Sequence, residues 1–186
     1  MRFPGIPPAD VFELVSNLDI RRRWEKQFPT MEIIEEHEKY KVVYWRVQMP
    51  LGVVNRDIVQ KMTYRRDEEN KLIYILYKNA THPSRPEEPG FVRAETILSA
   101  TLIRPEENDP NSTKLTIMLQ NDPKGWIPKF IVNMFAAKAP VDWRDSLANF
   151  YHNVYKKEKE DQPEEKEQVI KEEEKKTGHK RRRGNE

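Results

Sequence analysis

The stretch that decides the fold is QNDPKGWIPKFIVNMFAAKAPVDWRDSLANFYHNVY, residues 120–155. Residues 121–125 are turn formers, and Pro128 follows where a proline in the first helical turn loses no hydrogen bond. Apolar side chains then recur at the spacing of one helix face, at Ile127, Phe130, Ile131 and Met134. The stretch predicts a long amphipathic helix that needs a large apolar surface, either as an ordinary core helix or as the cover of a cavity.

Pro140 interrupts this predicted helix. Asp142 can cap a second segment after it, because an aspartate side chain accepts hydrogen bonds from the first free N–H groups of a helix. The apolar stripe resumes there at Trp143, Leu147, Phe150, Tyr151 and Val154. We therefore expect two helical segments that meet at Pro140.

The residues before this stretch predict an antiparallel sheet. One helix is expected to begin after Pro7-Pro8 and to end before Pro29. Six strands follow, expected at residues 31–38, 40–49, 57–64, 72–78, 91–103 and 114–120. Short connections favour antiparallel neighbours. The predicted fold class is α+β, with a curved antiparallel sheet packed against a long C-terminal helix.

The last residues, 156–186, differ from the rest in composition, because Val169 and Ile170 are the large aliphatic residues among many Lys and Glu. Such a segment buries too little surface to offset its ordering entropy, so we expect a disordered tail or a lone solvated helix. This leaves one domain, residues 1–155. The basic end at residues 180–183 has three readings: a solvated terminus, a nuclear-localisation signal or a lipid-headgroup contact.

The sequence lacks the signatures of the common catalytic and cofactor sites. The absence of Cys excludes a disulfide framework, a thiol nucleophile and a Cys-ligated zinc. The four His form no i, i+4 pair, and neither a glycine-rich phosphate loop nor a G-x-S-x-G motif is present. The net charge of +2 is too small to indicate nucleic-acid binding. We expect no metal, no cofactor and no enzymatic activity.

No segment is apolar enough for insertion into a membrane. An apolar h-region is absent after Met1, and no run of about 18 apolar residues occurs, which predicts neither a signal peptide nor a transmembrane helix. We expect a cytoplasmic protein that is peripheral at membranes, with a nuclear location as an alternative from the basic tail end.

Four short motifs stand in order along the chain: Arg21 with Trp24-Glu25, Asn55-Arg56-Asp57, residues 82–95 and residues 122–129. In this order and spacing they resemble the START domain, the lipid-transfer module related to steroidogenic acute regulatory protein. The resemblance covers about residues 1–155. The last motif is similar to the sterol-binding branch of the family, whereas Asn55-Arg56-Asp57 and residues 42–45 are similar to the phosphatidylcholine-transfer branch.

The resemblance implies a helix-grip fold, in which the curved sheet surrounds a lipid cavity and the C-terminal helix covers it. The function implied is the binding of a single lipid, phospholipid favoured over sterol, and its transfer between membranes by a monomer. An alternative is a lipid-sensing or scaffold module whose charged tail recruits a partner. The gate implied by the resemblance consists of Leu51, Val53, Val54, Trp126 and Pro140.

The resemblance also carries over lipid-binding residues. Arg21 matches an arginine that meets lipid phosphate, and Trp45 matches one wall of a choline cage. Each residue also has a purely structural interpretation. Arg21 could form an ion pair with Glu25, and Trp45 could be an ordinary core tryptophan. Ile58 and Ile97 occupy cage positions that are aromatic in that branch, which removes most of the cation–π attraction for choline. Further acyl-chain contacts are expected on the covering helix, at Phe130, Ile131 and Met134.

START domains usually begin with a helix and two further strands, and Met1 aligns with the third strand. The resemblance therefore implies that the usual first helix and strands are missing from residues 1–155. An exposed sheet edge and a cavity without one of its walls would follow.

Overall fold

The structure is a computed structural model and describes residues 1–50 and 52–161 of the 186. Two compact units divide the chain, Met1–Ala148 and Asn149–Glu186. The first unit holds the whole sheet. The described part of the second contains a π-helix, η1 (Tyr151–Tyr155), and the short helix α4 (Lys156–Glu160). The tail predicted from residue 156 lies mostly outside the described residues.

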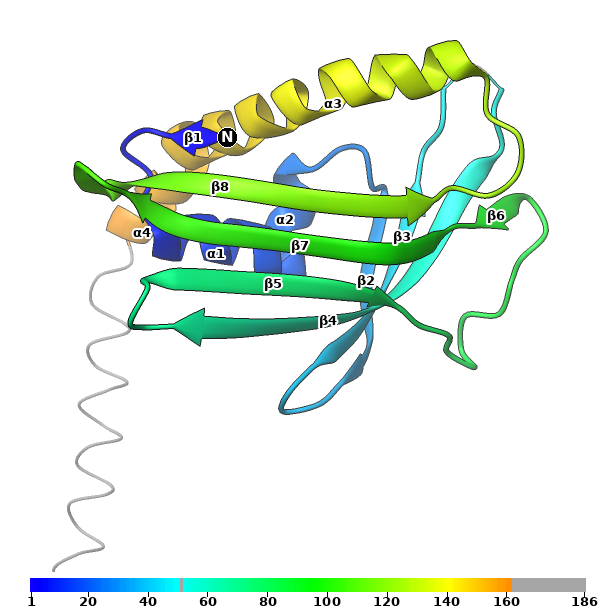
Figure 1. Cartoon of the computed structure of the whole chain (residues 1–186), viewed down its shortest axis with the longest axis horizontal. Helices are drawn as coiled ribbons and strands as arrows, with labels where there is room; N and C mark the ends of the chain where they lie inside the picture. The colour runs from blue at the N-terminus through cyan, green and yellow to red at the C-terminus, as the bar shows by residue number, and fades with distance from the viewer. Residues whose placement is uncertain (51, 162–186) are drawn as a thin grey trace, which may run out of the picture. The chain divides into compact units, whose positions relative to one another are not determined.

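One eight-stranded sheet organises the first unit, in the order β1-β8-β7-β5-β4-β3-β2 with β6 beside β4 (Figure 1). The strands are β1 (Arg2–Phe3), β2 (Thr30–Glu36), β3 (Lys41–Val47), β4 (Asn55–Asp67), β5 (Leu72–Asn79), β6 (Phe91–Arg93), β7 (Glu95–Glu106) and β8 (Asp109–Asp122). All pairings are antiparallel except β4 with β6. The predicted curved antiparallel sheet is confirmed.

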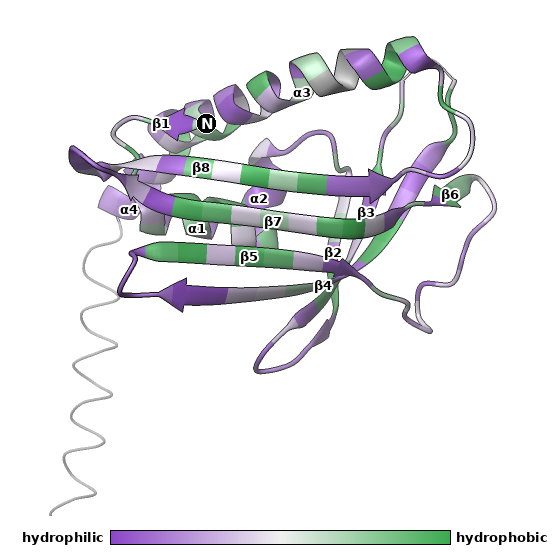
Figure 2. Ribbon diagram, viewed as in Figure 1, coloured by the Kyte–Doolittle hydropathy of each residue, from purple (hydrophilic) through white to green (hydrophobic). Residues whose placement is uncertain are grey.

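The strand predicted at residues 91–103 is two strands, β6 and β7. Ala94 separates them, and its backbone N–H donates to the Asp57 carbonyl at 2.9 Å. Figure 2 shows hydrophobic residues gathered along β5 and β7. The period-two pattern places one face of these strands toward the core, where Ile75 and Ile103 are fully buried.

Two helices, α1 (Pro8–Ser16) and α2 (Leu18–Trp24), replace the single N-terminal helix that the sequence predicted. The break lies at Asn17, whose Oδ1 accepts the N–H groups of Asp19 and Ile20 at 3.1 and 3.4 Å and so caps α2. Helix α1 lies against β7 and β8, and α2 lies against β2. Three apolar residues of α1 are buried: Val11, Leu14 and Val15.

Helix α3 runs unbroken from Lys129 to Phe150 with Pro140 inside it, so the predicted break is wrong. Proline removes one backbone hydrogen bond and crowds the preceding turn. Buried side chains on both sides of it, Ile131 and Leu147, hold the two halves in place. Between them, Trp143 packs edge-on against Trp24 of α2, with ring centroids 5.2 Å apart. Tertiary packing therefore outweighs the local preference of the proline.

The outer edge of β8 is only partly covered. Strand β1 pairs with β8 at Thr113 and Lys114, and toward Asp122 the edge has no strand partner within the described residues. The neighbouring halves of β7 and β8 expose several large apolar side chains: Ile97, Leu98, Ile117, Met118 and Leu119. Such an edge can accept a further strand.

Candidate functional site

A cavity of about 750 Å³ lies in the first unit between the sheet and the middle of α3. Its apolar walls include Phe28, Ile58, Leu115 and Ile117, and Pro140 lines it from α3. Its polar lining includes Arg21, Gln60, Tyr77, Ser99 and Thr101. A mostly apolar cavity of this size with a few convergent polar groups is typical of a small-molecule site.

The charged group of this cavity is Arg21, near the end of α2. Its guanidinium lies over the Trp45 ring, 5.1 Å from the ring centre, and donates to the Val15 carbonyl at 3.2 Å. Glu25, one helical turn further, is 3.9 Å from Nη2 of Arg21. Both side chains are nearly buried, with 11% and 6% of their surface exposed. The structure therefore brings together Arg21 and Trp45, the two residues for which the resemblance implied lipid binding, and also shows the Arg21–Glu25 ion pair.

Glu25 connects this part of the cavity to α3. Its carboxylate accepts a hydrogen bond from the side chain of Trp143 and another from the backbone N–H of Gln27. Burial raises the pKa of Glu25 above its ordinary value, while the charge of Arg21 and these hydrogen bonds oppose the rise. Movement of α3 away from the sheet would therefore break a hydrogen bond to a buried carboxylate.

Tyr77 of β5 is a cavity residue that the sequence reading missed. Its ring lies edge-on to Trp45, with centroids 6.3 Å apart, and its hydroxyl lies beside Arg21. Burial raises the pKa of the Tyr77 phenol, and the charge of Arg21 acts in the opposite direction. The alternation Ile73, Ile75, Tyr77 along β5 would have indicated that it faces inward.

Arg56 of β4 joins two loops at one end of α3. Its guanidinium donates to the carbonyls of Lys124 at 2.9 Å, Pro123 at 3.2 Å and Trp126 at 3.5 Å, and also to Val54. Burial lowers the pKa of Arg56, which is 3% exposed. The predicted gate also included Pro140, which lies within α3 in the structure, so the term gate is restricted to the two loops, residues 52–54 and 123–126. Arg56 fixes the two halves of the gate to each other, a role that the sequence reading did not assign.

The gate and the start of α3 expose apolar side chains. Trp126 is 80% exposed, Phe130 61% and Val54 49%. Large apolar residues exposed close together are typical of a surface that contacts a protein or a membrane. Lys129, which is also exposed, adds a positive charge at the start of α3.

The predicted site residues divide into two groups. Arg21, Trp45, Ile58 and Pro140 line the cavity. Three others do not: Ile97 and Phe130 are exposed, and Ile131 is buried outside the lining. Ile97 lies at a register shift between Thr96 and Leu98, which turns its side chain outward. Leu51 and the side chain of Met134 lie outside the part of the chain that the structure describes.

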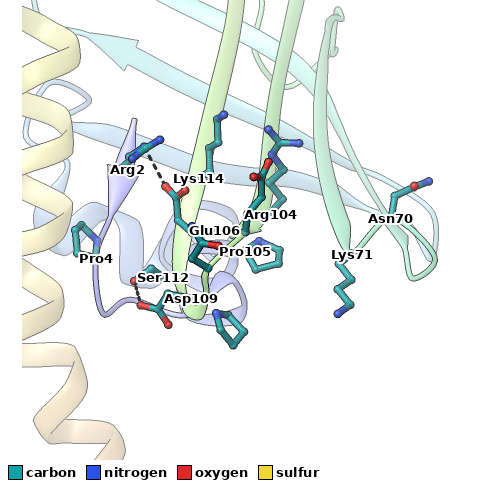
Figure 3. Close-up of a pocket in the computed structure, with 13 residues that line it drawn as sticks. Arg2, Pro4, Asn70, Lys71, Arg104, Pro105, Glu106, Asp109, Ser112 and Lys114 are labelled. Atoms are coloured by element: carbon teal, nitrogen blue, oxygen red, sulfur yellow. Dashed lines mark hydrogen bonds and ion pairs between the residues drawn. The ribbon is translucent and has the colours of Figure 1, made fainter.

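A second hollow, also of about 750 Å³, lies among the β4–β5 turn, the β7–β8 hairpin and β1 (Figure 3). Its lining is polar and carries both charges. Arg2 pairs with Glu106 at 3.3 Å, and the Ser112 hydroxyl donates to Asp109. Because its polar lining mixes positive and negative side chains, the hollow gives no indication of a particular ligand.

Across residues 1–50 and 52–161, no group of three or more His, Asp or Glu is placed to hold a metal ion. Within the same ranges, every helix is too short or too polar to span a bilayer.

The family model and the relatives with similar sequences agree on one family. Residues 5–156 match the family model of the START domain. Steroidogenic acute regulatory protein, mitochondrial, of Danio rerio is 31% identical over 144 residues, which cover 74% of this chain and 50% of that protein. The chain thus spans about half the length of the curated relatives it matches.

Two human structures show the same fold. STARD10 superposes with a TM-score of 0.71 at 23% identity, covering 84% of this chain and 64% of the other. StAR-related lipid transfer protein 5 superposes with a TM-score of 0.70 at 21% identity, covering 80% and 73%. At these identities the structures establish the fold, and the family model establishes the membership. The chain belongs to the START domain family of lipid-binding and lipid-transfer proteins.

Proposed function

We propose that the chain binds one lipid molecule in the cavity between the sheet and α3, and transfers it between membranes. We assign this function to residues 1–155, acting as a monomer. The observation that carries the proposal is the cavity itself, which is about 750 Å³ in volume and combines apolar walls with the nearly buried Arg21. Burial of an acyl chain against such walls is favourable by about 0.8 kcal/mol per methylene group.

A phospholipid suits this cavity better than a sterol. A phosphate group forms strong charge-assisted hydrogen bonds with a guanidinium, whereas a sterol hydroxyl offers no negative charge. The resemblance to the START family places Val43 near the position of a cavity carboxylate in the sterol-binding branch, and here this residue is apolar and fully buried. The buried Arg21 therefore supports a lipid with a phosphate-bearing headgroup.

Transfer requires the cavity to open at a membrane. The exposed Trp126, Phe130 and Val54 supply apolar side chains that can enter the interfacial region of a bilayer. Lys129 would add about 1 kcal/mol of attraction to anionic headgroups. We propose that these residues make a transient, peripheral contact with the cytoplasmic face of a membrane, during which α3 moves away from the sheet.

A vesicle assay tests the proposal. Donor vesicles carry a self-quenched fluorescent phospholipid, phosphatidylcholine in one series and phosphatidate in another, and acceptor vesicles carry none. The full chain should increase the fluorescence at a rate proportional to its concentration, and a fluorescent sterol should move more slowly. Binding of lipid without transfer would favour the alternative function, a lipid-sensing or scaffold module. Neither binding nor transfer of either lipid would contradict the proposal.

A further inference from the structure

Three buried side-chain donors in the cavity, two of them on the neighbouring Arg21 and Tyr77, have no acceptor at full hydrogen-bond geometry. They are Nε of Arg21, Nε1 of Trp45 and the hydroxyl of Tyr77. Trp45 and Tyr77 are 3% and 6% exposed, and all three residues line the same cavity. A buried donor without an acceptor is costly, and most native donors are satisfied. Three such donors together indicate what kind of ligand group the cavity accepts.

The side chains that carry these three donors are neighbours, whereas two other donors near them are satisfied. The Arg21 guanidinium lies 5.1 Å from the centre of the Trp45 ring, and the Trp45 and Tyr77 rings are 6.3 Å apart. By contrast, Trp24 donates its indole N–H to the Leu14 carbonyl at 3.1 Å, and Gln60 donates to the Thr96 hydroxyl. The unsatisfied donors are therefore a feature of one end of the cavity. We call Arg21, Trp45 and Tyr77 the donor cluster.

The same geometry opposes a cationic headgroup. A quaternary ammonium is held by aromatic faces, and the protein's own guanidinium already lies over the Trp45 ring. A second positive charge there would be repelled by Arg21. Ile58, which also lines the cavity, offers no aromatic face.

We propose that the donor cluster binds the oxyanion of an acidic lipid, a carboxylate or a phosphate monoester, in preference to a choline headgroup. This inference rests on the proposed function and specifies its ligand class. The guanidinium, indole and phenol groups come from three elements, α2, β3 and β5, and line the same cavity. An oxyanion has enough lone pairs to accept all of them.

Four probes with the same 18-carbon monounsaturated chain isolate the headgroup: oleic acid, oleoyl lysophosphatidate, oleyl alcohol and oleoylcholine. Their affinities for the full chain are measured by isothermal titration calorimetry below the critical micelle concentrations. We expect one or both anionic probes to bind at least about tenfold more tightly than oleyl alcohol and oleoylcholine, since a hydrogen bond to a charged group has this effect. The order of the two anionic probes distinguishes a carboxylate from a phosphate ligand.

Variants locate the effect. Tyr77→Phe keeps the ring against Trp45 and removes only the hydroxyl, so the affinity for the preferred anion should fall about ten- to hundredfold. The affinity for oleyl alcohol should change less than about threefold. Tyr74→Phe removes the same atom from a β5 residue outside the cavity lining and should change neither affinity. Arg21→Lys, which keeps the charge, should lose less affinity than Arg21→Gln.

The outcomes separate this inference from the proposed function. Equal affinities for all four probes, or the tightest binding for oleoylcholine, would refute anion binding by the donor cluster, while the proposed lipid binding would still hold. An anion preference that survives in Tyr77→Phe and Arg21→Gln alike would also overturn it. No binding of any probe would overturn the proposed function as well.

Discussion

Replacing Arg56 by lysine should loosen the gate without unfolding the sheet. Arg56 donates to four carbonyls, and a lysine ammonium on a more flexible stem reaches about one of them. The contact with Trp126, at 3.5 Å, is marginal. About two hydrogen bonds are therefore lost. Pro123 and Lys124 are exposed, so their carbonyls regain water and each loss is worth about 0.5–1.5 kcal/mol. We expect a fall of about 1–3 kcal/mol in the free energy of unfolding.

Hydrogen exchange measured by mass spectrometry locates this loss. Peptides covering residues 52–56 and 121–130 should exchange faster in Arg56→Lys, because opening of the gate no longer breaks the full set of bonds. Peptides from β5 and β7 should exchange as in the parent chain. Arg65→Lys, an exposed substitution on the same strand, is the matched control and should change neither region. Faster exchange spread evenly over all strands, or unchanged exchange at the gate, would refute the role assigned to Arg56.

Three further predictions follow from α2 and α3. Burial raises the pKa of Glu25 above 4.5, so the folded chain keeps this proton to a higher pH than the unfolded chain does. The contribution of Glu25 to the free energy of unfolding therefore falls as the pH rises from 4.5 through the raised pKa. Urea melts at several pH values should show a smaller fall in Glu25→Gln than in the parent chain. An equal dependence of the unfolding free energy on pH in the parent and the variant would count against this. Trp126→Ala changes an 80% exposed position, so the melting temperature should stay unchanged. Binding to anionic vesicles, measured by sedimentation, should weaken by about tenfold. Unchanged vesicle binding would exclude Trp126 from the membrane contact. Pro140→Ala restores a backbone N–H within α3 and so stiffens the helix. Lipid transfer should slow, while lipid binding persists. Equal transfer rates in the parent and the variant would show that Pro140 has no role in opening the cavity.

The sequence predicted the elements that depend on local pattern. Alternating apolar residues placed strands near β2 to β5, and the apolar stripe from Phe130 to Leu147 placed a long helix after the last strand. These signals are strong because one buried face dictates each of them. They were sufficient to predict a curved antiparallel sheet with a C-terminal helix.

Features that depend on packing between elements were not predicted correctly. Pro140 predicts a break in the helix, but buried residues on both sides keep α3 continuous. Asn17 reads as an ordinary helical position, but its side chain caps a new helix. Propensity is a weak guide wherever tertiary contacts or a cap decide the outcome.

The candidate site was predicted in part for the same reason. Arg21, Trp45 and Ile58 line the cavity as expected from the resemblance, but Ile97 turns outward at a bulge that has no sequence signature. Tyr77 and Arg56 acquire their roles from the register of β4 and β5 and from loops distant in sequence. A single sequence does not give register, and a shift of one residue would have reversed each assignment.

Native mass spectrometry tests the central claim, that one lipid occupies the cavity between the sheet and α3, most directly. The full chain is incubated with a mixed phospholipid extract, beside a variant in which Ser99→Phe narrows the cavity and a control, Gln120→Phe, at an exposed position outside the lining. The account predicts one bound lipid per chain in the parent and the control, and a smaller lipid-bound fraction in the narrowed variant. An equal lipid load in all three proteins, or none in the parent, would contradict it.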